Sequence, residues 1–337
     1  MNSASHPLRD PRRNVEINVG KACNNRCVFC IDGLPKREDR SYMDIGHMKS
    51  EIKRFYELGN RSLGFLGGEP TTYPKLPEAI QYASDMGYTR IAIATNATKL
   101  RLTHYTDRLI EAGLTRVTVS MHGHTSDLED RLTRVPGNFR KKVVALRYMI
   151  KLRDEGKLPD NVSVNIVVNG WNYMYMPQMM RFFFRLGLND LRANFVRTEG
   201  YALDDASITP RFSDVVPYIM KAVMLNEFHY RRSFTLSGFP LCTLPLELIG
   251  NSKLSQKVLG EFRDLDTDCS VRSESDTPFG IEELGEGRAR FNWQDRKRAD
   301  LKMKPDRCMQ CRYDNVCEGV WNAYPDFHGL GEITPIP

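Results

Sequence analysis

Apolar residues recur in two rhythms through the first two thirds of the chain. Short runs that are alternating or almost unbroken predict six strands, at residues 15–19, 63–66, 90–95, 116–121, 162–168 and 190–196. Apolar residues spaced three and four positions apart predict helices, at 44–58, 76–86, 106–112, 139–152 and 173–186. Strands that alternate with helices indicate a parallel sheet with right-handed crossovers. Six units are too few for a closed eight-stranded barrel, so we expect an α/β fold with a partial (β/α)6 TIM-like barrel.

This regular pattern ends near residue 205. One more helix is predicted at 210–225, and the sequence beyond it is rich in polar and turn-forming residues. We therefore expect a barrel domain over residues 1–205 and a loop-rich second region over 206–337.

The composition is typical of a globular protein that can bury a sizeable core. The chain has 337 residues, of which 41% are apolar and 27% are charged. No run of roughly 18 apolar residues predicts a membrane span. The N-terminal residues are polar and do not resemble a signal peptide, so a cytoplasmic location is expected.

Three cysteines follow the first predicted strand. Cys23, Cys27 and Cys30 have the spacing C-x3-C-x2-C. Three thiolates in one short loop can hold three corners of a cubane [4Fe–4S] cluster and leave the fourth iron open to a small molecule. Structural zinc would need a fourth ligand, and the nearest downstream histidine, His47, is well away from the loop. A disulfide is disfavoured because the thiols are few for a chain of this size.

The cysteine loop and a second motif together resemble the radical SAM enzymes. The family loop, C-x3-C-x-(aromatic)-C, is matched here with Phe29 at the aromatic position, and the family motif G-G-E-P is matched by residues 67–70. The resemblance implies that the open iron binds S-adenosylmethionine. One electron would then cleave this cofactor to a 5′-deoxyadenosyl radical, which abstracts hydrogen from a substrate. It also implies that Gly67, Gly68 and Glu69 line the methionine amino group and that Phe29 packs near the adenine.

Further cofactor contacts are expected where the predicted strands end, because barrel enzymes build their sites at that edge of the sheet. In chain order the candidates are Asn96, Ser120, His122, Asn165 and Arg197. A lone histidine such as His122 is also often only a hydrogen-bonding wall residue.

A second set of cysteines lies in the C-terminal region. Cys308, Cys311 and Cys317 have the spacing C-x2-C-x5-C, which is similar to the auxiliary-cluster motif of the SPASM and Twitch extensions of radical SAM enzymes. The resemblance implies a second [4Fe–4S] cluster, with Cys242 as first choice for its fourth ligand and Cys269 as second. Cys269 is alternatively a hydrogen-atom donor to a substrate radical or an unreactive thiol. Structural zinc is the simpler occupant of a C-x2-C pair.

The net charge of +6 is concentrated between residues 288 and 307, where eight arginines and lysines stand against three aspartates. This segment is either a solvated face or a docking patch for an acidic electron donor such as a flavodoxin or ferredoxin. An RNA-modifying protein is a further alternative, although no recognised nucleic-acid module accompanies the segment. We expect an enzyme that oxidises or rearranges a small metabolite or peptide, with a ribosomal-peptide maturase as the alternative.

Overall fold

The computed structural model describes residues 13–32, 40–270, 282–283 and 289–337. Eight strands run parallel in one curved sheet. They are β1 Asn14–Asn18, β2 Ser62–Leu66, β3 Arg90–Thr95, β4 Arg116–Ser120, β5 Val162–Val168, β6 Asp190–Phe195, β7 Ser233–Ser237 and β8 Thr267–Cys269. The order across the sheet is β7-β6-β5-β4-β3-β2-β1-β8, followed by the antiparallel strands β10 (Ala289–Asn292) and β9 (Glu282–Glu283). Within the described chain β7 and β8 are not paired with each other, so the barrel is open there.

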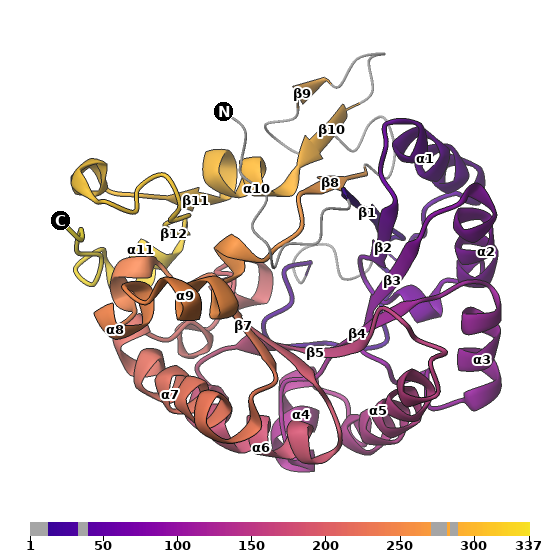
Figure 1. The fold of residues 1–337 in the computed structure, drawn as a ribbon, viewed down its shortest axis with the longest axis horizontal. Helices are drawn as coiled ribbons and strands as arrows, with labels where there is room; N and C mark the ends of the chain where they lie inside the picture. Colours follow the sequence, from indigo (N-terminus) through magenta and orange to yellow (C-terminus); the bar gives the residue numbers. More distant parts are fainter. Residues whose placement is uncertain (1–12, 33–39, 271–281, 284–288) are drawn as a thin grey trace.

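Helices cover the outer, convex side of this sheet, as Figure 1 shows. They are α1 Ile45–Glu57, α2 Leu76–Met86, α3 Thr103–Glu111, α4 Ser126–Thr133, α5 Asn138–Asp154, α6 Met176–Arg185 and α7 Phe212–Leu225. The predicted partial α/β barrel is therefore confirmed. No helix in the described part of the chain has the length and apolar character needed to cross a membrane.

The hydrophobic core lies between the sheet and the helices. Alternate strand residues such as Ile17, Ile93 and Val119 are completely buried in it. Burial of one such side chain stabilises the fold by about 1.5–3 kcal/mol. The intervening residues, such as Glu16 and Arg192, face the inside of the barrel, where they line a cavity. The two faces of the sheet thus have opposite character, and the polar face is available for chemistry.

The C-terminal region contributes to the barrel as well as extending it. Strands β7 and β8 were not predicted, and they join the two edges of the parallel sheet beside β6 and β1. The remaining elements are short, as expected for a loop-rich region. They are α8 Leu246–Ile249, α9 Ser252–Val258, α10 Trp293–Arg296, β11 Lys302–Met303, β12 Val320–Trp321 and α11 Tyr324–His328.

Candidate active site and auxiliary cysteine site

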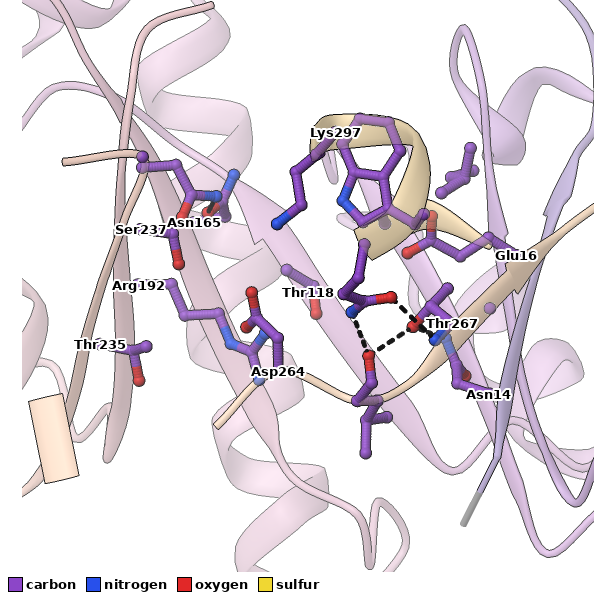
Figure 2. A pocket seen from close by; sticks show the side chains of 18 of the residues that line it. Asn14, Glu16, Thr118, Asn165, Arg192, Thr235, Ser237, Asp264, Thr267 and Lys297 are labelled. Carbon is purple, nitrogen blue, oxygen red and sulfur yellow. Dashed lines mark hydrogen bonds between the residues drawn. The ribbon is translucent and has the colours of Figure 1, made fainter. Parts of the chain in front are cut away.

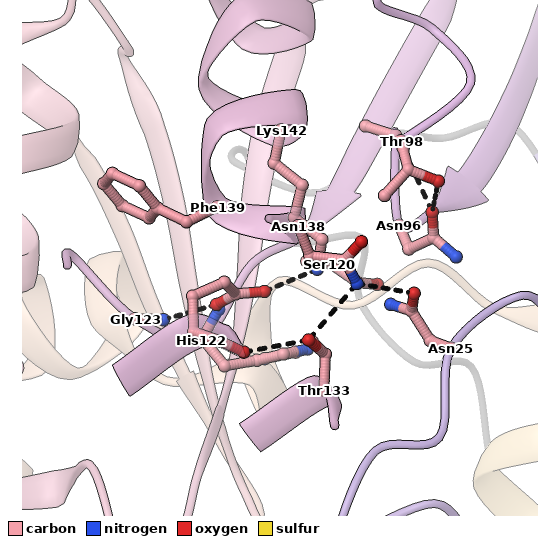
Figure 3. Close-up of polar contacts among 12 residues, drawn as sticks. Asn25, Asn96, Thr98, Ser120, His122, Gly123, Thr133, Asn138, Phe139 and Lys142 are labelled. Carbon is pink, nitrogen blue, oxygen red and sulfur yellow. Dashed lines mark hydrogen bonds and ion pairs between the residues drawn. The ribbon is translucent and has the colours of Figure 1, made fainter. Parts of the chain in front are cut away.

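The loop that follows β1 carries the first three cysteines, and it is fastened to helices α4 and α5. The backbone N–H of Arg26 donates to the carbonyl of Thr133 at 3.0 Å. The side-chain amide of Asn138 donates to Asn25 Oδ1 at 2.8 Å and to Thr133 Oγ1 at 3.2 Å (Figure 3). Both backbone and side-chain bonds therefore hold the cysteine loop in place.

The three thiols of this loop lie close together and are partly buried. The pKa of Cys23 is raised to about 11 and that of Cys27 to about 12, mainly by burial, and the charges of neighbouring cysteines, Cys30 among them, contribute to both shifts. None of the three forms a disulfide. Buried thiols of this kind stay protonated near neutral pH unless a metal replaces the proton.

These thiols fit a cluster better than a single ion. The three thiols are one ligand short of the four that a structural zinc site takes. A cubane cluster binds each cysteine at a separate iron atom, so its ligands do not have to converge. The chemistry and placement of the three cysteines therefore fit a [4Fe–4S] cluster.

The G-G-E-P segment packs directly against the cysteine loop. The N–H of Glu69 donates to the carbonyl of Ala22 at 2.8 Å. Gly67 has φ of +122°, and a Cβ there would lie 2.4 Å from Asn18 Oδ1. A Cβ on Gly68 would lie 2.3 Å from the carbonyl oxygen of Ala22. Only glycine permits this approach of two backbones.

We expect Gly68→Ala to impair cofactor binding. The new methyl group would collide with the Ala22 carbonyl, next to Cys23, and overpacking of this kind costs about 1–3 kcal/mol. We expect less iron per chain after anaerobic reconstitution and weaker binding of S-adenosylmethionine, measured by equilibrium dialysis. Gly331→Ala is the matched control, because a Cβ there would meet nothing within 4 Å. Iron content and affinity equal to those of Gly331→Ala would contradict the prediction.

Both carboxylate oxygens of Glu69 accept hydrogen bonds within the protein. Its Oε1 accepts from the N–H of Thr71 at 3.0 Å and from the hydroxyls of Thr71 and Thr95 at 2.5 Å each. Its Oε2 accepts from the N–H of Asn96 at 2.6 Å. Glu69 thus ties the end of β3 to the G-G-E-P loop. The carbonyls of the two motif glycines accept no hydrogen bond from any described residue, so they remain as acceptors for a ligand.

Two further predicted contacts, Asn96 and His122, support the cysteine loop. The side-chain amide of Asn96 donates to Asn24 Oδ1 at 2.6 Å. The His122 ring packs edge-on against Phe29, with ring centroids 4.7 Å apart, and its Nδ1 accepts from the N–H of Val167 at 3.0 Å. Burial lowers the pKa of His122 well below its ordinary value, so the ring is neutral. His122 therefore acts as a wall residue that fixes Phe29.

A buried ion pair supports the loop that follows β4. Lys142 Nζ lies 2.5 Å from Glu129 Oε1, and both side chains are 0% exposed. The other oxygen of Glu129 accepts from the N–H groups of His122 and Gly123 at 2.7 Å each. Lys142 also donates to the carbonyl of Ser120 at 2.8 Å (Figure 3). The pair thereby positions two of the predicted cofactor contacts, Ser120 and His122.

The inside of the barrel contains a polar cavity of about 340 Å³. Two predicted contacts, Asn165 and Arg197, line it (Figure 2 labels Asn165). Asn165 Oδ1 accepts from the side-chain amide of Asn194 at 2.7 Å. The Arg197 guanidinium lies 5.1 Å and 4.8 Å from the ring centroids of Trp293 and Trp321. The C-terminal region therefore forms part of the cavity wall.

The second cysteine set also comes together. The pKa of Cys242 is raised to about 11, mainly by burial, and the nearby charges of Cys317, Cys308 and Cys311 contribute to this shift. Cys269 is not part of this group. It lies on β8, opposite Glu16 of β1, and burial raises the pKa of its thiol well above the ordinary value.

The second cysteine set is surrounded by backbone donors. Cys317 Sγ accepts from the N–H of Gly319 at 3.4 Å, and Cys311 Sγ accepts from the N–H of Ile336 at 3.4 Å. Hydrogen bonds of this kind stabilise sulfur that carries negative charge, as cluster ligands do. The chain near residue 336 therefore covers this cysteine group.

A family model described as the radical SAM superfamily matches residues 17–183, which include both the cysteine loop and the G-G-E-P motif. The chain belongs to the radical SAM superfamily. Enzymes of this superfamily use a [4Fe–4S] cluster and S-adenosylmethionine, so the predicted family, enzymatic nature and cofactors of this radical SAM protein are confirmed.

Curated relatives of this radical SAM protein include enzymes with different substrates. It is 29% identical over 201 residues to a PqqA peptide cyclase of Bradyrhizobium diazoefficiens. The matched region covers 58% of this chain and 50% of that protein. It is 30% identical over 189 residues to a GTP 3′,8-cyclase of Aquifex aeolicus. The matched region covers 54% of this chain and 56% of that protein. The chain thus spans about half the length of the curated relatives it matches.

Solved structures share the fold over a larger part of the chain. SuiB of Streptococcus suis, bound to the precursor peptide SuiA, matches with a TM-score of 0.65 and 17% identity, over 94% of this chain and 72% of that chain. The anSMEcpe enzyme with bound AdoMet and Kp18Cys peptide matches with a TM-score of 0.54 and 17% identity, over 66% of this chain and 63% of that chain. The likeness to SuiB extends into the C-terminal region, in agreement with the predicted SPASM/Twitch-type architecture.

The basic segment between residues 288 and 307 is largely engaged within the protein. Lys297 and Lys302 are buried, and both form ion pairs with Glu318, at 2.8 Å in the case of Lys302. Lys304 pairs with Asp314 at 2.6 Å. These three lysines therefore do not form the docking or RNA-binding patch considered from the sequence. The side chains of residues 288–291 lie outside the described residues, and an acidic electron donor stays a prediction.

Sequence reasoning did not identify the residues that brace the site. Asn25 lies in the cysteine loop and Lys142 in the helix predicted at 139–152, whereas Glu129 and Asn138 lie where no element was predicted. One signal was present for the barrel interior, because polar residues alternate with apolar ones in strands such as D-L-R-A-N-F, residues 190–195.

Proposed function

We propose that this protein cleaves S-adenosylmethionine reductively and abstracts hydrogen from a small metabolite or peptide, which is then oxidised or rearranged. The observation that carries the proposal is the packing of the cysteine loop against the G-G-E-P segment, which follows directly on the strand β2 that lines the polar barrel cavity. The cluster, when bound, supplies the electron that cleaves S-adenosylmethionine and so generates the radical that attacks the substrate.

The residues of the chain would divide the work as follows. Cys23, Cys27 and Cys30 would hold the cluster, and the carbonyls of Gly67 and Gly68 would accept hydrogen bonds from the methionine ammonium group. Phe29, fixed by its contact with the neutral His122 ring, would give the adenine a flat apolar surface. The buried surroundings would keep water away from reactive species.

A ribosomal-peptide maturase is the second candidate. It is favoured by the match to SuiB with its precursor peptide over 94% of the chain and by the PqqA peptide cyclase relative. The GTP 3′,8-cyclase relative favours a small metabolite instead. Products formed from candidate peptides and metabolites would distinguish the two.

We also propose that Cys242, Cys308, Cys311 and Cys317 hold an auxiliary [4Fe–4S] cluster. Four thiols that lie together, one buried and three half-buried, and that backbone N–H groups approach support this assignment. With four ligands such a cluster is closed to substrate and would transfer electrons or stabilise the region.

Iron and sulfide per chain after anaerobic reconstitution test both cluster assignments. We expect about eight irons in the wild type and about four in a Cys23/Cys27/Cys30→Ala variant. Cys242→Ala should also hold about four irons, whereas Cys269→Ala should keep about eight, because its thiol lies apart. About four irons in the wild type and none in the triple variant would contradict the auxiliary cluster.

A further inference from the structure

A buried group of charged side chains lies where the barrel cavity meets the auxiliary cysteines. Lys297, Lys302 and Glu318 all line the cavity, and Glu318 follows Cys317 directly in the chain. We propose that Lys302, held in this group, raises the reduction potential of the auxiliary cluster at Cys317, so that the cluster takes up an electron more readily. This inference rests on the proposed auxiliary cluster and deepens it, because it favours electron transfer over a purely structural role.

Two lysines of this group share one carboxylate. Lys302 Nζ lies 2.8 Å from Glu318 Oε2, and Lys297 pairs with the other oxygen of the same carboxylate. The Lys297 side chain reaches into the cavity from the turn after α10 (Figure 2). The side chain of Lys302 is 1% exposed, and those of Lys297 and Glu318 are 8% exposed. Three charges are therefore held away from solvent, two of them positive and one negative.

Two further carboxyls act on these lysines. Burial raises the pKa of Glu16 to about 7, against the charge of Lys297 among others. Burial and the charge of Glu318 raise the pKa of Glu261 to about 7, against the charge of Lys302. Both carboxyls are therefore mostly uncharged at about pH 6, where the two lysines outweigh Glu318 by one positive charge.

The segment that carries Cys317 packs against β11, the strand of Lys302. Lys302 is paired with Trp321 of β12, and Gly319 lies between Cys317 and that strand. Gly319 has φ of +80°, and a Cβ there would lie 2.2 Å from the carbonyl oxygen of Met303, so the two backbones are in close contact. Burial raises the pKa of the Cys317 thiol, and the charge of Lys302 acts in the opposite direction, because it stabilises negative sulfur.

A positive charge beside Cys317 favours the reduced form of a bound cluster. A cubane held by thiolates is negatively charged, and one-electron reduction adds one more negative charge. Net charge and solvent exposure are among the factors that set the potential of such a cluster. Because the Lys302 side chain is buried, solvent screens its charge only weakly. Removal of this charge should therefore make the cluster harder to reduce.

The test is a redox titration of the auxiliary cluster, followed by electron paramagnetic resonance at about pH 6. The parent protein is the full chain with Cys23/Cys27/Cys30→Ala, so the signal comes from the auxiliary cluster alone. We expect Lys302→Met in this parent to lower the equilibrium constant for one-electron reduction about tenfold, a shift of about 59 mV to more negative potential. Glu318→Gln should shift the potential in the opposite direction, because it removes a negative charge and leaves both lysines.

Lys304→Met is the matched control. Lys304 directly follows β11, and its charge also acts on a cysteine of the auxiliary group, Cys308. It pairs with Asp314 at 2.6 Å, but the two side chains are 31% and 33% exposed. Because solvent screens this pair, Lys304→Met should change the reduction constant less than about twofold.

Two results would overturn the inference: equal potentials in Lys302→Met and its parent, or shifts of the same sign in Lys302→Met and Glu318→Gln. Shifts of the same sign would show that both changes disturb the cluster itself and not its electrostatic surroundings. If Lys302→Met holds no cluster, Lys302→Gln, which can still donate to Glu318, decides by the same criterion. Iron content separates this inference from the proposed function. A parent without iron contradicts the auxiliary cluster, whereas bound iron with an unchanged potential contradicts only the role of Lys302.

Discussion

Cys27→Ala is expected to abolish the formation of 5′-deoxyadenosine from S-adenosylmethionine. Cys27 is the middle ligand of the proposed cluster, and its partly buried thiol lies beside the other two cysteines. Alanine offers no ligand, and the surrounding chain has no other thiol in this loop to replace it. The measurement is chromatographic detection of 5′-deoxyadenosine under reducing, oxygen-free conditions, together with iron content.

Loss of the product must be separated from loss of the fold. The cysteine loop is held by hydrogen bonds through Arg26, Asn25 and Asn138, none of which involves the Cys27 thiol. The variant should therefore keep the far-ultraviolet circular dichroism spectrum of the wild type and the auxiliary iron, about four atoms per chain. Retention of 5′-deoxyadenosine formation by Cys27→Ala would overturn the assignment of the catalytic cluster.

The six predicted strands were recognisable because their outer faces are apolar and the helices between them are regular. Strand β8 was missed because it has only three residues, T-D-C, and β7 because just two residues of its sequence S-F-T-L-S are apolar. The strand conformation of β7 depends on its pairing with β6, and that of β8 on its pairing with β1. Strand β1 is distant from β8 in the sequence. Helix α4 was missed for a similar reason, since it has only eight residues, and just Leu128 and Leu132 are its buried apolar side chains.

The candidate site was predictable where its parts are local in sequence. The cysteine loop and the G-G-E-P motif are short patterns with fixed spacing, so they could be read directly. The grouping of Cys242 with the last three cysteines could not be established from spacing, because about 66 residues separate it from Cys308. The burial of Lys302 beside the Cys317 segment was likewise hidden, since it is a property of three-dimensional surroundings.

Glu129 and Lys142 illustrate the same limit most clearly. Charged residues on amphipathic helices are mostly exposed, so neither position stands out in the sequence. In the structure both side chains are completely buried and joined to each other. The pair connects α4, α5 and the loop after β4, which makes it part of the framework of the site.

Lys142→Met is expected to destabilise the protein by about 3–5 kcal/mol, because it leaves the Glu129 carboxylate buried without its cation. The double variant Lys142→Met/Glu129→Gln should be less destabilised than Lys142→Met, since glutamine carries no charge and can still accept from the His122 and Gly123 N–H groups. Chemical denaturation monitored by circular dichroism measures both changes.

The matched control lies at the C-terminal end of α5, the helix that also carries Lys142. Lys151 and Glu155, four residues apart, form an exposed ion pair at 3.7 Å, with side-chain exposures of 68% and 38%. Lys151→Met should change the free energy of unfolding by less than about 1 kcal/mol, because solvent screens both charges. Equal effects of Lys142→Met and Lys151→Met would show that the buried pair does not support the fold. A double variant as unstable as Lys142→Met would show that the lost contacts of the lysine, and not the unpaired carboxylate, cause the destabilisation.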